Sequence, residues 1–383
     1  MSAHTHRPAS LNRFCHAFAL AAVLGQSAPA LAAPTVPMTA LPLSFDRPIG
    51  LDLHEPSGRL ITTRNYPDGV GGNLALLGLQ FAAPLPSANV PASTPFSSLA
   101  GVRDEVNLLT VRSNHSFAAP VGTVFVVDQT GLVRKLSADG SSVTHFAQLP
   151  NSSGAGASGD NINLAMDSTG VWGGRIVASS GGGSLFLLDA AGNVETLATG
   201  MGRLQGVNFI PNDAARWGRF AGCIMAGTEG GGAIGSVPTH LWCRASDGNV
   251  RHETRNLGVR AEDIDVITAG NLYAIDFQQG RFWGAAETAF ASLQGEMLLS
   301  QEVPETGSSG LFHVGFDIAS DSFTVEALDL QFSTGGSTGH SWEQIVFGHI
   351  EINPPPAGGV PEPASLALVL GALGLTVRFS RRR

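Results

Sequence analysis

The feature that most constrains the fold of this chain is an internal repeat. Three ten-residue segments align without gaps: VFVVDQTGLV (124–133), LFLLDAAGNV (185–194) and LWCRASDGNV (241–250). Each segment has an aromatic second residue and a glycine at its eighth position: Gly131, Gly192 and Gly248. A glycine at one fixed place between two apolar runs supplies the positive φ angle that a tight hairpin turn requires. The repeat therefore predicts three β-hairpins.

The segments upstream of these hairpins repeat as well. Trp172–Ser179 resembles Trp217–Gly227, and Gly270–Asp276 is a looser copy of both. Further upstream lie short apolar strands with one shared pattern: Ile49–Leu53, Ile162–Met166, Gly206–Ile210 and Asp263–Ile267. A unit of about four short strands over roughly 45 to 60 residues has the size of one propeller blade.

The spacing of the repeat predicts an all-β protein built as a β-propeller. Candidate first strands lie near residues 49, 102, 162, 206, 263 and 313, which predicts six blades within a domain spanning 41–350. The second blade is the least regular, because Val102–Val111 fits the repeat poorly. Radial stacking would bury the apolar strands and leave no exposed sheet edge. The competing fold is a pair of β-sandwiches, which no alignment within the sequence favours.

Composition agrees with many short strands and tight turns. The 383 residues include 48 glycines and 22 prolines, and 14% of the residues are charged. Such a composition favours strands and turns over long helices. The formal net charge is −9, and no basic patch lies between the two chain ends, which argues against nucleic acid as a partner.

The N-terminus has the layout of a secretory signal peptide. Arg7 and Arg13 precede a short apolar run at Ala17–Gly25, and Ala30 and Ala32 form a small-residue cleavage pattern. This order predicts a signal peptide over residues 1–32 and export through the Sec translocon. An uncleaved N-terminal anchor is the alternative, but the apolar run is too short to span a membrane.

The C-terminus carries three parts in a fixed order. A triplet of Pro361, Glu362 and Pro363 is followed by an uncharged apolar stretch over 364–377. Four arginines close the chain: Arg378, Arg381, Arg382 and Arg383. The apolar stretch is shorter than the roughly 20 residues that span a bilayer comfortably. The basic tail would hold its end in the cytoplasm.

Together, the parts over residues 360–383 resemble the PEP-CTERM sorting signal of Gram-negative bacteria. The resemblance implies transient insertion of the apolar helix into the inner membrane, where an exosortase recognises the triplet and cuts near it. It further implies delivery to the cell surface or to the extracellular exopolysaccharide matrix. An ordinary tail anchor is the alternative, although it would not need the triplet. Residues 351–359, rich in proline and glycine, predict a stiff linker before this signal.

One position of the predicted first strands is polar among apolar neighbours: Asp52, Asn163, Asn208 and Asp265. Because the first strand of a blade lines the central channel, these side chains would converge near the channel axis. Ca²⁺ or another divalent ion prefers such oxygen ligands. Simple hydration by channel water is the competing interpretation. Asp160, Glu262 and Asp263 could support a metal, although Glu262 and Asp263 could equally cap a turn.

Two cysteines follow the predicted signal peptide, Cys223 and Cys243. An even pair in an exported chain favours a disulfide. Two buried thiols in a β core are the alternative.

Two functions are compatible with these features, and the fold alone does not decide between them. The first is a non-enzymatic surface or matrix protein that binds polysaccharide, another surface protein or a small ligand through loops on one face of the propeller. The second is a metal-dependent hydrolase of lactonase or esterase type that uses the polar ring. Gluconolactonase-like propellers resemble this chain only in the general spacing of their repeated strands. Those propellers hold a divalent ion with acidic and asparagine side chains. The sequence predicts no individual catalytic residue.

Overall fold

The structure is a computed structural model of the whole chain. It describes residues 33–64, 74–77, 93–102, 105–150, 161–229, 237–302, 310–333 and 340–349. The predicted signal peptide (1–32), linker (351–359) and sorting signal (360–383) lie outside the described residues. No helix in the part of the chain that the structure describes is long and apolar enough to cross a membrane.

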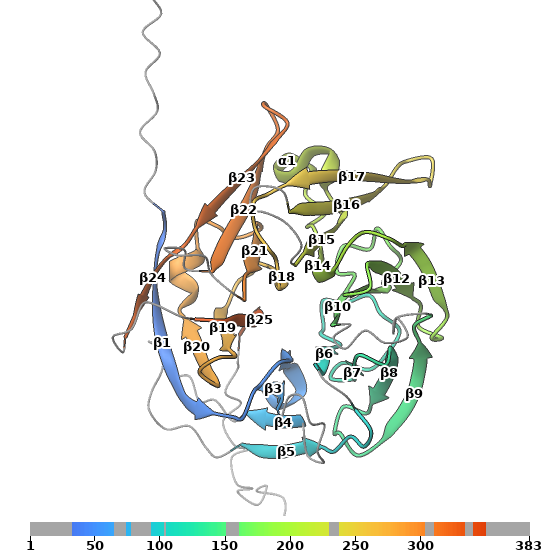
Figure 1. Cartoon of the computed structure of the whole chain (residues 1–383), viewed down its shortest axis with the longest axis vertical. Helices are drawn as coiled ribbons and strands as arrows, with labels where there is room; N and C mark the ends of the chain where they lie inside the picture. The colour runs from blue at the N-terminus through green and yellow to red at the C-terminus, as the bar shows by residue number, and fades with distance from the viewer. Residues whose placement is uncertain are drawn as a thin grey trace, which may run out of the picture. The chain divides into compact units, whose positions relative to one another are not determined.

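The described strands form six sheets, arranged around a common centre as the blades of a β-propeller (Figure 1). From the centre outward, blade 1 contains β2 (Leu51–His54), β3 (Arg59–Thr63), β4 (Leu74–Leu77) and β5 (Thr94–Ser97). Blade 2 contains β6 (Asn107–Thr110), β7 (Val124–Val127), β8 (Leu132–Leu136) and β9 (Val143–Gln148). Neighbouring strands in both blades are antiparallel.

Blades 3, 4 and 5 repeat this antiparallel arrangement. Blade 3 contains β10 (Ile162–Met166), β11 (Ile176–Ser180), β12 (Ser184–Leu188) and β13 (Val194–Ala198). Blade 4 contains β14 (Leu204–Phe209), β15 (Ile224–Thr228), β16 (Pro238–Arg244) and β17 (Val250–Asn256). Blade 5 contains β18 (Asp263–Val266), β21 (Met297–Ser300), β22 (Leu311–Asp317) and β23 (Ser322–Ala327).

Blade 6 is assembled from distant parts of the chain. From the centre outward, it contains β25 (Trp342–Gly348), β19 (Asn271–Asp276), β20 (Arg281–Ala285), β1 (Thr35–Ser44) and β24 (Asp329–Phe332). Strands β19 and β20 are an insertion between the first two strands of blade 5, and β24 pairs with β1 in parallel. Since β1 and β25 share this sheet, the ring cannot open without breaking the ladders β1–β20 and β19–β25.

The prediction of six blades is confirmed, but two details of the predicted assignment are wrong. The segment near residue 313 is β22, the third strand of blade 5, and β25 is the sixth inner strand. Gly270–Asp276 does contain a second strand, β19, but this strand belongs to blade 6. Both errors arise because a sequence repeat assumes contiguous blades. Strand β1 also extends the propeller upstream of the predicted boundary at residue 41.

The three predicted hairpins are present. Their turn glycines Gly131, Gly192 and Gly248 have φ angles of 71°, 84° and 82°, which a side chain would strain. The hairpins do not, however, occupy equivalent places. The first joins the second and third strands of blade 2, whereas the others join the third and fourth strands of blades 3 and 4.

The hydrophobic core lies between the blades. Among the described residues, buried apolar side chains form six clusters, one between each pair of neighbouring blades. Strand β7 shows the cause: Val124 and Val126 pack towards blade 1, whereas Phe125 and Val127 pack towards blade 3. Alternate residues of a strand face opposite sides of a sheet, and here both sides are covered. Burial of each such side chain stabilises the fold by about 2 kcal/mol.

Helices are short. The α-helix α1 (Ala214–Trp217) begins after Asp213, whose carboxylate accepts hydrogen bonds from the backbone N–H groups of Ala215 and Arg216. Among the described residues, the 3₁₀ helices are η1 (Glu55–Ser57), η2 (Gly218–Phe220) and η4 (Glu287–Phe290). In blade 4, a disulfide joins Cys223, just before β15, to Cys243 in β16, with the two Cα atoms 4.3 Å apart.

Candidate functional site

The central channel has two chemically different ends. The inner strands contact one another in a closed ring, in the order β2, β6, β10, β14, β18 and β25. We call the end where these strands begin the acidic mouth; its carboxylates belong to Glu105, Glu229, Glu262, Glu302 and Glu343. We call the end where they finish the arginine mouth; it is lined by Arg112, Asn114 and Thr268, which follow β6 and β18.

Between the mouths, the residues predicted as a metal ring form hydrogen bonds between blades. Asp52 Oδ2 accepts from the backbone N–H of Thr110 at 2.6 Å. Asp265 Oδ2 accepts from the backbone N–H of Phe347 at 3.0 Å. In the described part of the chain, the inner strands of neighbouring blades do not pair through their backbones. Instead, a side chain on one inner strand forms a hydrogen bond with the backbone of the next.

The two asparagines of the predicted ring also form hydrogen bonds between blades: Asn208 bonds to the neighbouring blade 5, whereas Asn163 bonds across the channel to blades 5 and 6. Asn208 Nδ2 donates to the carbonyl oxygen of Ile264 at 2.9 Å. Asn163 Nδ2 donates to the carbonyl oxygen of Glu262 at 3.1 Å, and Asn163 Oδ1 accepts from Gln344 Nε2 at 2.9 Å. Gln344 Oε1 in turn accepts from the backbone N–H of Leu51 at 2.8 Å, which links the last blade to the first.

The structure brings only part of the predicted ring together. Asn208 Nδ2 lies 3.3 Å from Asp265 Oδ1. Asp52 instead forms an ion pair with Arg112. Asp52, Asn208 and Asp265 line a small cavity of about 100 Å³ inside the channel, and Asn163 is not among its lining residues. That the four residues hold a metal stays a prediction.

A larger cavity opens at the arginine mouth. It has a volume of about 470 Å³, and it shares Arg112, Asn114 and Thr268 with the small cavity inside the channel. The Arg112 guanidinium is partly exposed, and its Nη1 donates to the carbonyl oxygen of Phe347 at 3.1 Å. Glu55 accepts from the backbone N–H of Ser113 at 2.8 Å and so holds the loop that carries Asn114.

Two carboxyl groups inside the channel, those of Asp263 and Asp265, have raised pKa values. Burial raises the pKa of Asp263 to about 7. Burial also raises the pKa of Asp265 to about 6, although the nearby Arg112 guanidinium opposes this rise. Burial and then the charge of Arg112 lower the pKa of His115 to about 4, so this imidazole is neutral at physiological pH.

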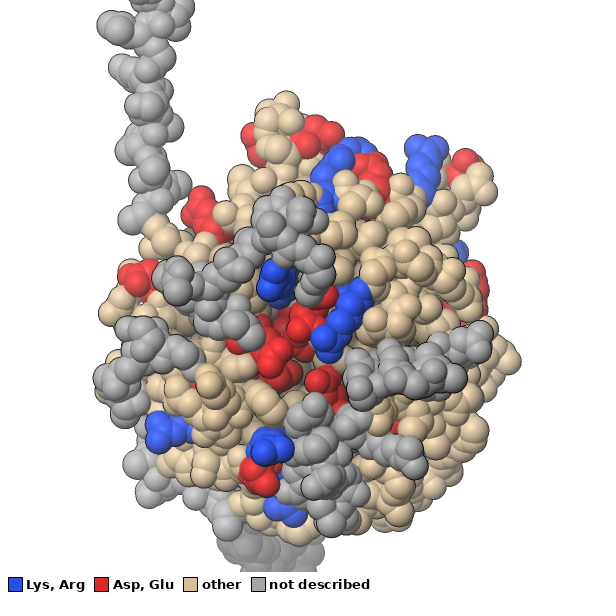
Figure 2. Space-filling view, in the orientation of Figure 1, with Lys and Arg blue, Asp and Glu red and all other residues tan. Residues whose placement is uncertain are grey.

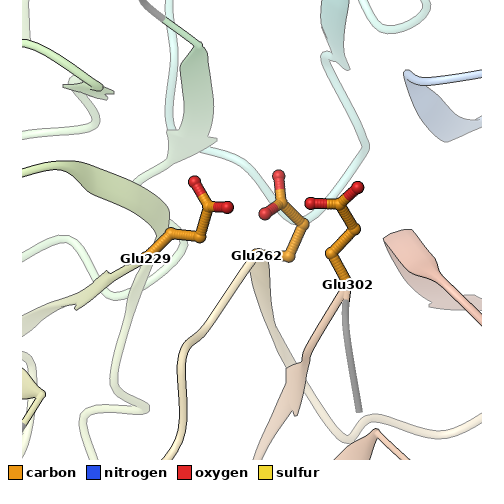
Figure 3. Close-up of side chains that lie close together, drawn as sticks. All are labelled: Glu229, Glu262 and Glu302. Atoms are coloured by element: carbon orange, nitrogen blue, oxygen red, sulfur yellow. The ribbon is translucent and has the colours of Figure 1, made fainter. Parts of the chain in front are cut away.

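At the acidic mouth, three carboxylates converge from two blades. Glu262 immediately precedes β18, Glu229 follows β15 and Glu302 lies two residues after β21. One oxygen from each of the three lies within 4.8 Å of the others, and Figure 3 shows the side chains turned towards one another. Figure 2 shows acidic side chains gathered at the centre of the viewed face.

Amide side chains hold this group in place. Asn161 Nδ2 donates to Glu262 Oε1 at 3.0 Å, and Asn107 Nδ2 donates to Asn161 Oδ1 at 2.8 Å. Gln205 Nε2 donates to Glu229 Oε2, which also pairs with Arg203 at 2.9 Å. Because the three amides lie at the starts of three inner strands, the network ties Glu229 and Glu262 to the inner strands of blades 2, 3 and 4.

Negative charge at the acidic mouth is poorly compensated. Glu262 and Glu343 are 3% and 4% exposed, and no Arg or Lys in the described ranges forms an ion pair with either. Burial, followed by repulsion from neighbouring carboxylates, raises the pKa of both groups well above its usual range. Such a concentration of perturbed groups is typical of functional sites.

Sequence reasoning found one member of this cluster, Glu262, and missed the others. Glu229 and Glu302 follow second strands, where the repeat gave no reason to single out a residue. Glu343 was missed because the inner strand β25 was not predicted. The usable signal was a Glu one or two residues from the end of an apolar strand that borders the channel.

Comparisons with known proteins identify no family for this chain. No family model matches this chain, and no curated protein matches its sequence. Solved structures with a similar fold include a protein provisionally assigned as a gluconolactonase, with 10% identity and a TM-score of 0.40; the match covers 76% of this chain and 94% of that one. Another is an ancestral GH74 enzyme, with 10% identity, a TM-score of 0.41 and coverage of 73% and 35%.

A third similar structure is the extracellular domain of a provisionally assigned hybrid two-component system from B. thetaiotaomicron. Its identity is 11%, its TM-score is 0.37, and the match covers 74% of this chain and 30% of that one. This chain therefore spans about a third of the length of the last two proteins. At these identities and scores, none of the three bears on what this chain does.

Proposed function

We propose that this protein is an exported β-propeller that binds a neutral saccharide unit at the arginine mouth. The observation that carries the proposal is the cavity of about 470 Å³ lined by Asn114, Thr268 and Arg112. Sites for small ligands typically have volumes of roughly 300 to 1,000 Å³ and place a few polar groups on an apolar lining. Leu53 and Phe347 contribute the apolar part of this lining.

The charges around the cavity favour a neutral ligand over an anion. The charge of Arg112 is offset by its ion pair with Asp52, and Glu55 contributes a carboxylate to the lining. Saccharide hydroxyls both donate and accept, so they would complement the Glu55 carboxylate and the amide and hydroxyl groups of Asn114 and Thr268.

Saccharide binding is tested by saturation-transfer NMR and calorimetry with D-glucose, D-galactose, D-mannose and L-rhamnose, and with D-glucuronate as the charged comparison. We expect at least one neutral sugar to bind more tightly than glucuronate. The double variant Asn114→Ala/Thr268→Ala should weaken that binding at least tenfold, about 1.4 kcal/mol. Thr144→Ala, on the outer strand β9, is the matched control and should bind as the wild type does. No binding of any neutral sugar, or tighter binding of glucuronate, would refute the proposal.

The proposed site of action is the envelope or exopolysaccharide matrix of a Gram-negative bacterium. This part of the proposal rests on the sequence of the two chain ends. In a host with an exosortase, the wild-type chain should reach the cell surface or matrix, whereas Pro361→Ala/Pro363→Ala should remain in the inner membrane. Pro355→Ala/Pro356→Ala, in the linker, is the control for the loss of two prolines. Equal distribution of all three chains would contradict sorting by the triplet.

A hydrolase of lactonase or esterase type is the second candidate. It is favoured by the carboxyl group of Asp265, which lines the inner cavity near Arg112 and has a pKa of about 6. A carboxylate with this pKa is suited to act as a general base near neutral pH. Hydrolysis of p-nitrophenyl acetate or γ-butyrolactone should then rise through pH 6 and be lost in Asp265→Asn. Absence of turnover, or full activity in this variant, would exclude the role.

A further inference from the structure

We propose that the acidic mouth binds one divalent cation, Ca²⁺, between Glu229, Glu262 and Glu302. This site is distinct from the predicted ring of Asp52 and Asp265, and it lies at the end of the channel opposite the proposed saccharide pocket. The two proposals therefore concern different residues, and each can be tested without the other.

The geometry of the three carboxylates suits a shared ion. One oxygen of each lies within 4.8 Å of the others, so a point between them lies no more than about 2.8 Å from all three, close to the 2.3 to 2.6 Å that is typical of Ca²⁺. The three residues come from both sides of the boundary between blades 4 and 5. An ion at this position would also link these two blades.

A second observation points to a missing ligand. Glu262 is 3% exposed, and its Oε2 atom has no hydrogen-bond partner among the described residues. Its other oxygen, Oε1, accepts from Asn161, which fixes the carboxyl group so that it faces Glu229 and Glu302 (Figure 3). Leaving a buried polar atom without a partner is costly. A bound cation would remove that cost.

The Asn107 side chain shows the same deficiency. It is 1% exposed, and its Nδ2 donates to Asn161 and to the carbonyl oxygen of Ile162. Its Oδ1 has no hydrogen-bond partner among the described residues. The amide network beside Glu262 therefore retains a buried oxygen acceptor in addition to the carboxylates.

The donor set indicates the class of ion. All three candidate ligands are carboxylates, and no His or Cys of the described residues joins the group. Hard oxygen donors on flexible glutamate side chains favour Ca²⁺, whereas Zn²⁺ prefers nitrogen and sulfur ligands. Mg²⁺ demands a near-ideal octahedral site and is expected to bind more weakly.

The test is a titration of the full-length purified protein, stripped with EDTA, with CaCl₂ as the probe and MgCl₂ and ZnCl₂ as comparisons. Calorimetry should give one Ca²⁺ per chain, and an excess of Ca²⁺ should raise the melting temperature by about 5 °C. The variant Glu262→Gln should lose at least tenfold in Ca²⁺ affinity. Glu195→Gln, on the exposed outer strand β13, is the matched control and should bind as the wild type does.

Folding of the variant is checked independently of the ion. In EDTA, Glu262→Gln should melt at or above the wild-type temperature, because it removes one of several repelling carboxylates. The Ca²⁺-induced rise should then be absent. No binding of Ca²⁺ at 1 mM (about a thousandfold above a micromolar Kd), or equal affinity in wild type and Glu262→Gln, would overturn the proposal.

Discussion

The two ends of the channel differ in whether their buried carboxylates have ion-pair partners. Next to the arginine mouth, the carboxylate of Asp52 is paired with Arg112 and accepts a hydrogen bond from a backbone N–H. At the acidic mouth, Glu262 and Glu343 are equally buried, yet neither has an ion-pair partner in the described part of the chain. One scaffold thus carries a buried carboxylate with a counter-charge at one end and, at the other, Glu262 and Glu343, buried carboxylates without one among the described residues.

This difference distinguishes buried polar side chains that support the fold from those that are available to bind a ligand. Carboxylates and amides that bond across blades, such as Asp52 and Asn208, complete the propeller and have their partners within the protein. Buried carboxylates that lack such partners lower the stability of the fold unless a bound ion or ligand provides the missing partner. The contrast predicts that substitutions at the two mouths change stability with opposite signs.

The largest effect is expected from Arg112→Leu. The substitution leaves Asp52, which is 4% exposed, as a buried carboxylate without its counter-charge. We expect the free energy of unfolding to fall by about 3 kcal/mol, measured by urea denaturation. The double variant Arg112→Leu/Asp52→Asn should recover more than half of this loss. A single variant within about 0.5 kcal/mol of wild type would show that the arginine mouth does not depend on this ion pair.

The next effect concerns pH and Asp265. Its folded pKa of about 6 lies above that of an unfolded Asp, so the folded state binds the proton more tightly. Its contribution to stability is fully present below pH 4 and is lost as the pH rises to about 6. Asp265→Asn should therefore be more stable than wild type at pH 7.5, by about 2 kcal/mol, and should lose this advantage at pH 4.

Denaturation curves of the wild type and Asp265→Asn at pH 4, 5, 6 and 7.5 give the measurement. Asp213→Asn, at the exposed helix cap, is the control for loss of a carboxylate elsewhere. If the free energy of unfolding depends on pH in the same way in the wild type and in Asp265→Asn, burial does not destabilise the charged form of this carboxyl group.

A smaller effect of the same sign is expected for Glu343→Gln at the acidic mouth. In EDTA, removal of this buried charge should raise the free energy of unfolding by about 1 kcal/mol, because repulsion from the neighbouring carboxylates is relieved. Urea denaturation in EDTA checks the change, with Glu195→Gln as control. A decrease in stability would mean that Glu343 is compensated within the protein, and the contrast between the mouths would then be lost.

The smallest effect is expected for Asn114→Ala at the rim of the arginine mouth. The side chain is exposed and forms no hydrogen bond within the described residues. The free energy of unfolding, measured by thermal denaturation, should therefore change by no more than about 0.5 kcal/mol. A larger loss would assign Asn114 a structural role and weaken the case for a ligand-binding residue.

The sequence predicted the part of the fold that depends on local pattern. Gly131, Gly192 and Gly248 marked real turns because a positive φ angle leaves a local signature. Blade 6 could not be predicted in the same way, since the pairing of β1 with β20 and of β19 with β25 joins segments distant in sequence. Non-local pairing leaves no periodicity in the chain.

The candidate sites show the same limit. Asp52 and Asp265 stood out because each is polar within an apolar strand, but this pattern cannot distinguish a ligand from a side chain that bonds to the next blade. Glu229 and Glu302 lie 73 residues apart in the chain, and only the folding of blades 4 and 5 brings their oxygens within 4.8 Å.

The acidic mouth, and not the ring between the mouths, is where we expect the channel to hold a cation. Anomalous diffraction from crystals grown with Tb³⁺ in place of Ca²⁺ tests this directly. We predict a single strong peak within about 2.6 Å of carboxylate oxygens of Glu229, Glu262 and Glu302. A peak beside Asp52 and Asp265, or no ordered peak in the channel, would contradict the proposed site.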